Sequence, residues 1–260
     1  MKKRLLQAVT LFFVCFFITS AGMAAGEEKD KNWKFDLAPL YLWGANLSGD
    51  MTMKGATAPV DLDFNTIWDN LEGVFTVHFE GVHTSGWGFI ANLDYLNIGA
   101  ENPAPVGGGT LKVDLKETIL GMDGFYRTQS GPHTYDVLFG IRYTDVDVTA
   151  DFSNIPDGGA NEGWVNAVVG VRYLYQMSEK WNLLTRGDLG LGQSDFTYQA
   201  LGIVKYQAWK NVSFFGGYRA LYDDYTTGSG NDQFRYDITM HGPILGINFS
   251  FSIFLHHPLI

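Results

Sequence analysis

Residues 135–144, with the sequence YDVLFGIRYT, contain the pattern that decides the fold class of this chain. Tyrosine and aliphatic or phenyl side chains occupy the odd positions, whereas Asp136, Gly140, Arg142 and Thr144 occupy even positions. Successive side chains of a β-strand point to opposite faces, so a period of two predicts a strand with one apolar and one polar face.

The same period recurs along most of the chain. Ten runs show it, at residues 33–45, 74–84, 86–98, 110–128, 133–150, 164–177, 181–193, 196–208, 212–224 and 234–251. Aromatic residues make up 15% of the chain and there are 31 glycines against 8 prolines, a composition that favours strands. We therefore predict an all-β protein.

The connections between the runs alternate in length. Short turns are expected at 84–86, 129–132, 178–180 and 208–211, and longer polar links at 46–73, 99–109, 151–163 and 225–233, with one short exception near 194–195. An even number of strands with short turns at one end and longer loops at the other is typical of a closed antiparallel transmembrane β-barrel. We expect about ten strands, within 8–12, because 46–64 could hide an extra hairpin.

The first 24 residues read as a secretory signal peptide. A basic start at residues 2–4 is followed by an apolar run at 5–18 and by small residues at 21–25. The run is short for a transmembrane anchor, the alternative interpretation. Cleavage after Ala24 would remove Cys15, the only cysteine, and would leave no disulfide and no thiolate ligand or nucleophile.

The remaining chain divides into a barrel at 25–251 and a short tail or strand extension at 252–260. No stretch of 18 apolar residues follows the signal peptide, so only a closed barrel could span a membrane. A soluble lipocalin-like barrel would turn the apolar face inward, whereas a membrane barrel turns it outward.

Aromatic residues on the apolar face favour the membrane barrel, because they gather in two bands. One band lies near the short turns (Trp87, Tyr135, Tyr175, Trp181, Tyr206 and Phe251) and the other near the long loops (Trp43, Tyr95, Tyr143, Tyr222 and Tyr236). The separation of the bands along a tilted strand is roughly 20 Å, close to the spacing of aromatic girdles in outer-membrane barrels. We therefore expect the chain in a bacterial outer membrane.

The apolar side chains switch between odd and even positions twice along the chain. The first switch is near Glu117, and the second is at Gly242–Pro243 in the last strand. Proline cannot donate a ladder hydrogen bond, so we expect a β-bulge at Pro243.

The polar face predicts a network of charges in the lumen. Its members are Glu80, Asp94, Asp136, Arg142, Arg172, Arg186, Asp188, Arg219, Arg235 and Asp237. The interior of a ten-stranded barrel is narrow, and an unpaired buried charge is costly. Two interpretations stay open: a salt-bridge plug that holds the barrel shape, and a narrow charge-lined pathway for small solutes.

Residues 61–72 match the acidic spacing of an EF-hand loop, but Thr66 stands where the loop needs glycine. We expect instead a short amphipathic helix near 64–72, with Ile67, Trp68 and Leu71 on one side, packed on the rim or into the barrel mouth. No metal ion or cofactor is expected.

Catalytic arrangements are weak in this sequence. His78 and Glu80 share the polar face of one strand, and His241 is expected inward near Thr239, with no serine beside either histidine. We expect no enzymatic activity. Acidic residues outnumber Lys and Arg by 28 to 18, which argues against a nucleic-acid partner. Acidic residues near the long loops, Asp223 among them, could bridge cations to lipopolysaccharide.

Several segments carry a family resemblance. The last strand, 241–251, looks like the C-terminal assembly signal of bacterial outer-membrane barrels, although nine residues follow Phe251. Residues 60–64 with Ile67 and 69–71, residues 194–201 and residues 217–219 resemble segments in a family of uncharacterised proteobacterial outer-membrane β-barrel proteins, which are small and porin-like. The resemblance implies the barrel and the compartment, and no activity.

The expected function is a structural or surface barrel with at most a narrow charge-lined pore. Its expected partners are outer-membrane lipid, lipopolysaccharide and, during biogenesis, the barrel-assembly machinery, and we expect a monomer. The alternatives are an outer-membrane enzyme, either a protease or a lipid-modifying hydrolase, and a soluble periplasmic ligand-binding barrel.

Overall fold

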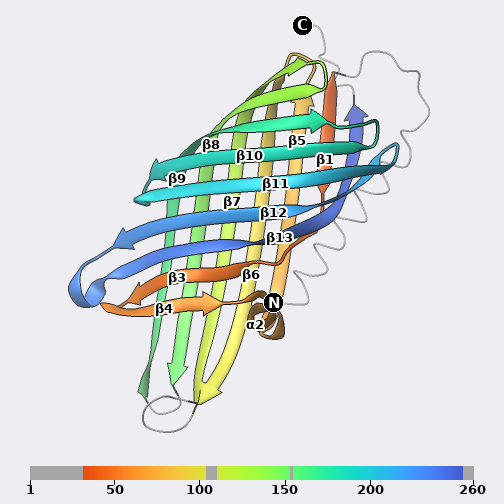
Figure 1. The fold of residues 1–260 in the computed structure, drawn as a ribbon. Coiled ribbons are helices and arrows are strands. Elements are labelled where there is room, and N and C mark those ends of the chain that lie inside the picture. Colours follow the sequence, from red (N-terminus) through yellow and green to blue (C-terminus); the bar gives the residue numbers. More distant parts are fainter. Residues whose placement is uncertain (1–31, 104–109, 153–154, 254–260) are drawn as a thin grey trace, which may run out of the picture.

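The computed structural model describes residues 32–103, 110–152 and 155–253 (Figure 1). The strands are β1 (Trp33–Ala38), β2 (Tyr41–Trp43), β3 (Asn46–Met53), β4 (Ala56–Leu62), β5 (Leu71–His83), β6 (Trp87–Pro103), β7 (Thr110–Ser130), β8 (His133–Phe152), β9 (Ile155–Gln176), β10 (Trp181–Gly192), β11 (Phe196–Trp209), β12 (Val212–Thr227) and β13 (Phe234–Ile253). The helical elements are α2 (Phe64–Asp69) and the 3-10 turn η1 (Gly230–Asp232). The predicted signal peptide and residues 254–260 of the predicted tail lie outside the described residues.

The strands form one antiparallel sheet that closes on itself. From β5 to β13, each strand pairs with the next one along the chain. β1 closes the ring, because Trp33 lies opposite His83 of β5 on one side and Ile253 of β13 on the other. The predicted closed barrel of ten strands is therefore confirmed. Among the described residues, no helix is long and apolar enough to cross a membrane.

The register of the strands sets their tilt. A ladder that starts at Lys34 and crosses every strand pair in turn reaches Met240 on β13, 12 residues from Ser252, the direct partner of Lys34. A stagger of this size over about ten strands tilts them by roughly 40° from the barrel axis. The resulting interior is narrow enough for side chains from opposite walls to meet.

The predicted link at 46–73 contains an extra hairpin. β1, β2 and β3 follow one another along β13, and β3 then turns back into β4. In the part of the chain that the structure describes, β4 pairs with β3 alone, so it extends the wall beyond the start of β5 and adds no strand to the ring. The helix α2 lies where β4 ends and β5 begins (Figure 1).

The helix α2 is shorter than predicted. Asp63 caps its N-terminus by accepting a hydrogen bond from the backbone N–H of Thr66, which holds the pKa of this carboxyl below its usual range. Ile67 is buried, whereas Trp68 is 55% exposed, so these two side chains do not share one side as predicted. Leu71 begins β5 instead of ending the helix.

No β-bulge lies at either position where the apolar side chains switch between odd and even positions. β7 keeps one register with β6 and β8 through Glu117, and β12 and β13 keep one register through Pro243. Even-numbered side chains of β13 face inward from Phe234 to Asn248. The apolar residues change face because the interior itself becomes apolar toward the long loops. The missing N–H of Pro243 lies opposite the break between β2 and β3, where the N–H of Gly44 donates to the Pro243 carbonyl.

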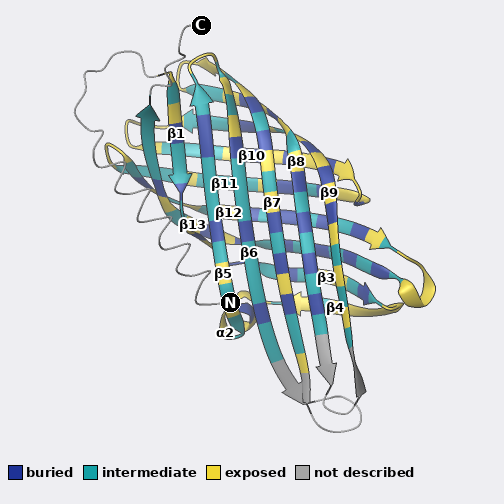
Figure 2. Ribbon diagram, turned by 180° about the vertical axis from the view of Figure 1, so that it is seen from behind, coloured by how far each residue is buried: buried dark blue, intermediate teal, exposed yellow. Residues whose placement is uncertain are grey.

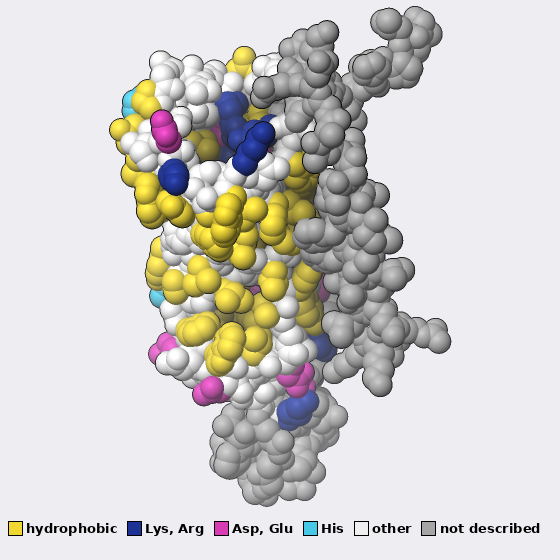
Figure 3. All heavy atoms as spheres, turned by 90° about the vertical axis from the view of Figure 1, so that its right-hand side faces the viewer, with side chains coloured by type: hydrophobic (Ala, Val, Ile, Leu, Met, Phe, Trp, Pro, Cys, Tyr) yellow, Lys and Arg dark blue, Asp and Glu magenta, His cyan; other side chains and the backbone are white. Residues whose placement is uncertain are grey.

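The outer surface of the barrel is apolar. Exposed and buried residues alternate along the strands (Figure 2), and hydrophobic side chains cover the middle of the face in Figure 3. Val169, Val171 and Val137 are each more than 60% exposed. Two members of the predicted aromatic bands face inward instead: Tyr236 is buried inside the barrel, and Trp43 lies against the Arg219 guanidinium there.

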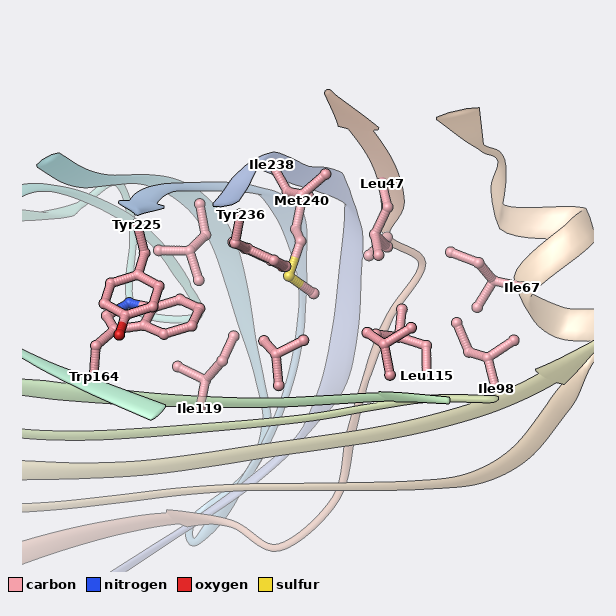
Figure 4. Close-up of a cluster of buried hydrophobic side chains, with 14 of the residues drawn as sticks. Leu47, Ile67, Ile98, Leu115, Ile119, Trp164, Tyr225, Tyr236, Ile238 and Met240 are labelled. Atoms are coloured by element: carbon pink, nitrogen blue, oxygen red, sulfur yellow. The ribbon is translucent and has the colours of Figure 1, made fainter. Parts of the chain in front are cut away.

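A hydrophobic core fills the barrel toward the long loops. Its buried side chains come from opposite walls and from α2 (Figure 4), and include Leu47, Ile67, Ile98, Leu115, Ile119, Val146, Val148, Trp164, Leu221, Tyr225, Phe234, Tyr236, Ile238 and Met240. Trp164 stacks on Tyr225 with ring centroids 4.4 Å apart. This core closes the lumen at that end.

Candidate functional site in the barrel interior

A layer of paired charges crosses the middle of the barrel, between the hydrophobic core and the short turns. The side chains come from inward positions of β5 to β12, and all except the partly buried Arg127 are buried although they are ionic. The members are the arginines 127, 142, 172, 186 and 219 and the carboxylates Glu80, Asp94, Asp123, Asp136 and Asp188. We call this set the charge layer.

One group of the charge layer joins β5, β7, β8 and β9. Arg172 donates to both oxygens of Glu80, at 2.6 and 2.8 Å, and to Asp136 at 2.8 Å. Arg127 contacts the same two carboxylates, at 3.1 Å and 2.8 Å. Both guanidinium groups also lie over the ring of Phe125, about 5 Å from its centroid. Each carboxylate thus meets two cations, and each cation also meets an aromatic face.

A second group joins β7, β8 and β10. Arg142 donates to Asp188 at 2.6 Å, and Arg186 donates to the other oxygen of Asp188 at 2.7 Å and to Asp123 at 2.9 Å. Arg142 also donates to the Thr197 hydroxyl. Asp188 is therefore held between two arginines in the same way as Glu80.

The third group links β2, β6, β11 and β12. Arg219 donates to Asp94 at 2.8 Å and to Gln199 at 2.9 Å. The Tyr41 hydroxyl donates to the other Asp94 oxygen, and Trp43 covers the Arg219 guanidinium at 4.3 Å. This group links β2 to β6 on one side and to β12 on the other.

The charge layer is balanced, with one carboxylate for each arginine. Taking a charge out of water is costly, and ion pairs with further hydrogen bonds offset that cost. Between the layer and the hydrophobic core there remains a cavity of about 20 Å³, enough for a single water molecule. The layer and the core together leave no wide passage through the described part of the barrel.

The structure places eight of the ten predicted lumen residues in this layer. Arg235 and Asp237 are not among them. They pair with each other at 2.7 Å near the long loops, and their side chains are 41% and 27% exposed. The prediction gave them the wrong face because it assumed a bulge at Pro243, whereas β13 keeps one parity throughout.

The sequence analysis missed Asp123 and Arg127. Both lie at odd positions of β7, the face opposite Leu120 and Met122, which point outward. The alternation of apolar and polar side chains along β7 could have placed both residues in the lumen. Asp123 and Arg127 complete the balance of the layer.

Two predicted residues lie elsewhere than expected. Asp223 is a buried strand residue, 3% exposed, which accepts from the Thr144 hydroxyl, and does not belong to an acidic loop. His241 faces outward, where its Nδ1 lies 2.7 Å from the Tyr218 hydroxyl.

His78 contacts Glu80 at 3.8 Å inside the barrel, but Glu80 is already held by two arginines. The described residues contain no group of three or more His, Cys, Asp or Glu side chains placed to hold a metal ion.

A larger cavity lies between the charge layer and the short turns. Its volume is about 280 Å³. One part of its lining is charged or polar and includes Lys34, Asp36 and Lys205, and another part is aliphatic or aromatic. We call it the vestibule.

Comparison with known proteins assigns no family. No protein-family profile matches the chain, and no curated protein matches it. The resemblance to a family of uncharacterised outer-membrane proteins therefore stays a prediction.

Solved structures of outer-membrane β-barrels resemble the fold. The outer-membrane protease OmpT of Escherichia coli shares 10% identity over 88% of this chain and 99% of its own, with a TM-score of 0.47. The outer-membrane protein OprG of Pseudomonas aeruginosa shares 11% identity over 85% of this chain and 97% of its own, with a TM-score of 0.37. The Yersinia pestis protein Ail shares 8% identity over 85% of this chain and 99% of its own, with a TM-score of 0.40. These similarities are too low to assign a function, and the chain is defined by its own features: a closed ten-stranded barrel with a balanced charge layer, a hydrophobic core at one end and a vestibule at the other.

Proposed function

We propose that the protein is a bacterial outer-membrane barrel that serves as a structural or surface element and has no enzymatic activity. The observation that carries the location is the continuous apolar outer face around a charged interior. In water, such a face would expose many large hydrophobic side chains, among them Val137, Val169 and Val171. In a bilayer, the same side chains contact lipid, and the closed ladder of strand pairs provides hydrogen-bond partners for the backbone N–H and C=O groups.

The charge layer supports a structural role in preference to an open pore. Every arginine of the layer is paired with at least one carboxylate within 3 Å. Charges committed to one another hold the opposite walls at a fixed distance and offer no free site to a passing ion. The interior therefore leaves at most a narrow charge-lined pathway.

The partners follow from the same location. We propose that the outward band contacts outer-membrane lipid, that the long-loop end meets lipopolysaccharide, and that the last strand is read by the barrel-assembly machinery during insertion. The barrel is proposed to act as a monomer.

Fractionation of cells that express the full chain tests the location. We expect the protein in the outer-membrane fraction, resistant to high salt and to alkaline carbonate, and released by detergent with heat-modifiable migration on a gel. Release by salt alone would instead support a soluble periplasmic barrel and would refute the proposal.

A further inference from the structure

The vestibule, with a volume of about 280 Å³, is a space that neither the charge layer nor the hydrophobic core fills. We propose that the vestibule binds a small organic anion with an apolar body, of the size and kind of an aryl carboxylate. Three observations carry this proposal: the volume of the vestibule, the combination of apolar and charged side chains in its lining, and the excess of cations over carboxylates among those charges.

The volume suits a ligand of two fused rings. The vestibule holds about 280 Å³, whereas an engineered cavity of about 150 Å³ already binds benzene. Space of this size between a sealed layer and the short-turn end forms a pocket with a single mouth. It can hold a molecule without passing it through the barrel.

One wall of the vestibule is apolar. It is formed by inward side chains of β9 to β13: Leu174, Leu184, Leu201, Ile203, Phe215 and Ile244. Ile203, Leu201 and Phe215 also pack against the small buried cluster of Ala38, Tyr41 and Ile244. Burial of an apolar ring against such a wall is favourable, because it removes apolar surface from water.

The charge layer forms the positively charged part of the lining. Arg127, Arg172, Arg186 and Arg219 all line the vestibule. Four of the five carboxylates that neutralise the layer (Asp94, Asp123, Asp136 and Asp188) do not line it, and Asp94 and Asp123 line the small cavity on the far side of the layer. Arg186 and Arg219 line both cavities, but Glu80 is the one carboxylate of the layer that lines the vestibule, so four cations of the layer face it against one carboxylate, which favours an anion there.

Two lysines add to the positive charge of the lining near the short-turn end. Lys205 lies 3.2 Å from Asp36, which is also held by Asn248 and Ser250. Lys34 lines the vestibule as well, and no ion pair of Lys34 is found within the described residues. A hollow with basic and acidic side chains opens at the upper end of the molecule in Figure 3, which is the short-turn end. A carboxylate that enters there meets Lys34 first and the arginines behind it.

Calorimetric titration of the purified barrel in lipid nanodiscs with 2-naphthoate tests the proposal, with empty nanodiscs as the blank. We expect one 2-naphthoate per barrel and at least tenfold weaker binding of 2-naphthamide, the neutral counterpart. Lys34→Gln removes one partly solvated charge, so it should weaken binding about threefold to fivefold. The binding site needs no particular membrane, so this test does not depend on the proposed location.

A pair of variants on β11 separates the vestibule from the lipid-facing surface. Ile203→Trp fills the vestibule and should weaken binding more than tenfold, whereas Val204→Trp adds the same bulk to the neighbouring residue, which is 39% exposed on the outer face. Heat-modifiable migration shows that both variants fold. If Ile203 proves intolerant, Leu201→Phe makes a smaller filling at the same wall.

The outcomes decide the proposal. Binding that prefers the anion and is lost in the Ile203 variant alone supports it. No binding of 2-naphthoate, equal binding of the amide, or equal loss in the Ile203 and Val204 variants overturns it.

Discussion

The replacement Arg172→Met tests whether the charge layer holds the barrel together. Arg172 is 3% exposed in its side chain and donates to Glu80 and Asp136 at 2.6 to 2.8 Å. Methionine fills most of the same space, but the layer then has five carboxylates against four arginines. Removal of one partner from a buried pair costs about 3–5 kcal/mol, because the remaining charge stays buried.

The structure sets the expected value at the lower end of that range. Arg127 contacts both carboxylates and stays in place, so neither is left without a cation. We therefore expect a loss of about 3 kcal/mol, which is roughly a 150-fold change in the unfolding equilibrium. Because Glu80→Gln removes the excess negative charge, the double variant should recover at least about 1 kcal/mol relative to the sum of the single changes.

Urea unfolding of the barrel in phospholipid vesicles measures these differences, with tryptophan fluorescence and heat-modifiable migration as the readouts. Arg235→Met is the matched control, because this arginine is paired but 41% exposed, and its loss should cost no more than about 1 kcal/mol. Equal effects of the two replacements, or no recovery in the double variant, would refute the structural role of the layer.

Three further replacements test other parts of the fold. Ile67→Ala should cost about 2–4 kcal/mol in the same unfolding assay, because Ile67 is buried in the hydrophobic core, whereas replacement of the exposed Asn65 by alanine should change little. A small effect of Ile67→Ala would contradict the packing of α2 into the core that closes the barrel. Val171→Arg should cost about 2–4 kcal/mol in vesicles, and Val171→Thr much less, because a charge within the lipid-facing apolar band is costly. An unchanged stability with arginine would argue against lipid contact at this face. Gly170→Ala should lower the unfolding midpoint, since the added Cβ would lie 2.5 Å from the Cβ of Asp188 and displace that carboxylate; a wild-type midpoint would show that the layer tolerates such a shift.

The strands and the closure of the barrel were predictable because they depend on local alternation. The run at 135–144 lies within β8, and the short turns at 84–86 and 178–180 separate strands as expected. Alternation shows which residues share a face of the strand. It predicts the inward and outward faces correctly where the outer face is apolar and the interior is charged.

The prediction was wrong where the interior itself becomes apolar. The pattern predicts Tyr236 on the outer face, because the outer face is apolar in the other strands, and it therefore assigns Arg235 and Asp237 to the lumen; the structure buries Tyr236 and leaves Arg235 and Asp237 partly exposed. A single strand cannot tell a bulge from a change of environment, because both invert the apolar parity. The distinction depends on the opposite wall, which supplies Leu115 and Ile119 to the same core.

The vestibule was not predictable, for a related reason. Its apolar lining combines side chains from β9 to β13, and its charged lining combines side chains from β1, β5, β7 and β9 to β12. Those residues meet only through the stagger of the whole barrel, a property of the complete ladder and not of any one strand.

Single-channel recording in a planar bilayer tests the central claim, that the interior is closed by the charge layer and the hydrophobic core. The refolded chain without residues 1–24 is compared with Arg172→Met and with a buffer blank, after heat-modifiable migration has shown folded protein. We predict a silent wild-type barrel at voltages that leave the bilayer intact. Stable, reproducible conductance steps from the wild-type chain would contradict the account, and would show that an open pathway runs between the paired charges.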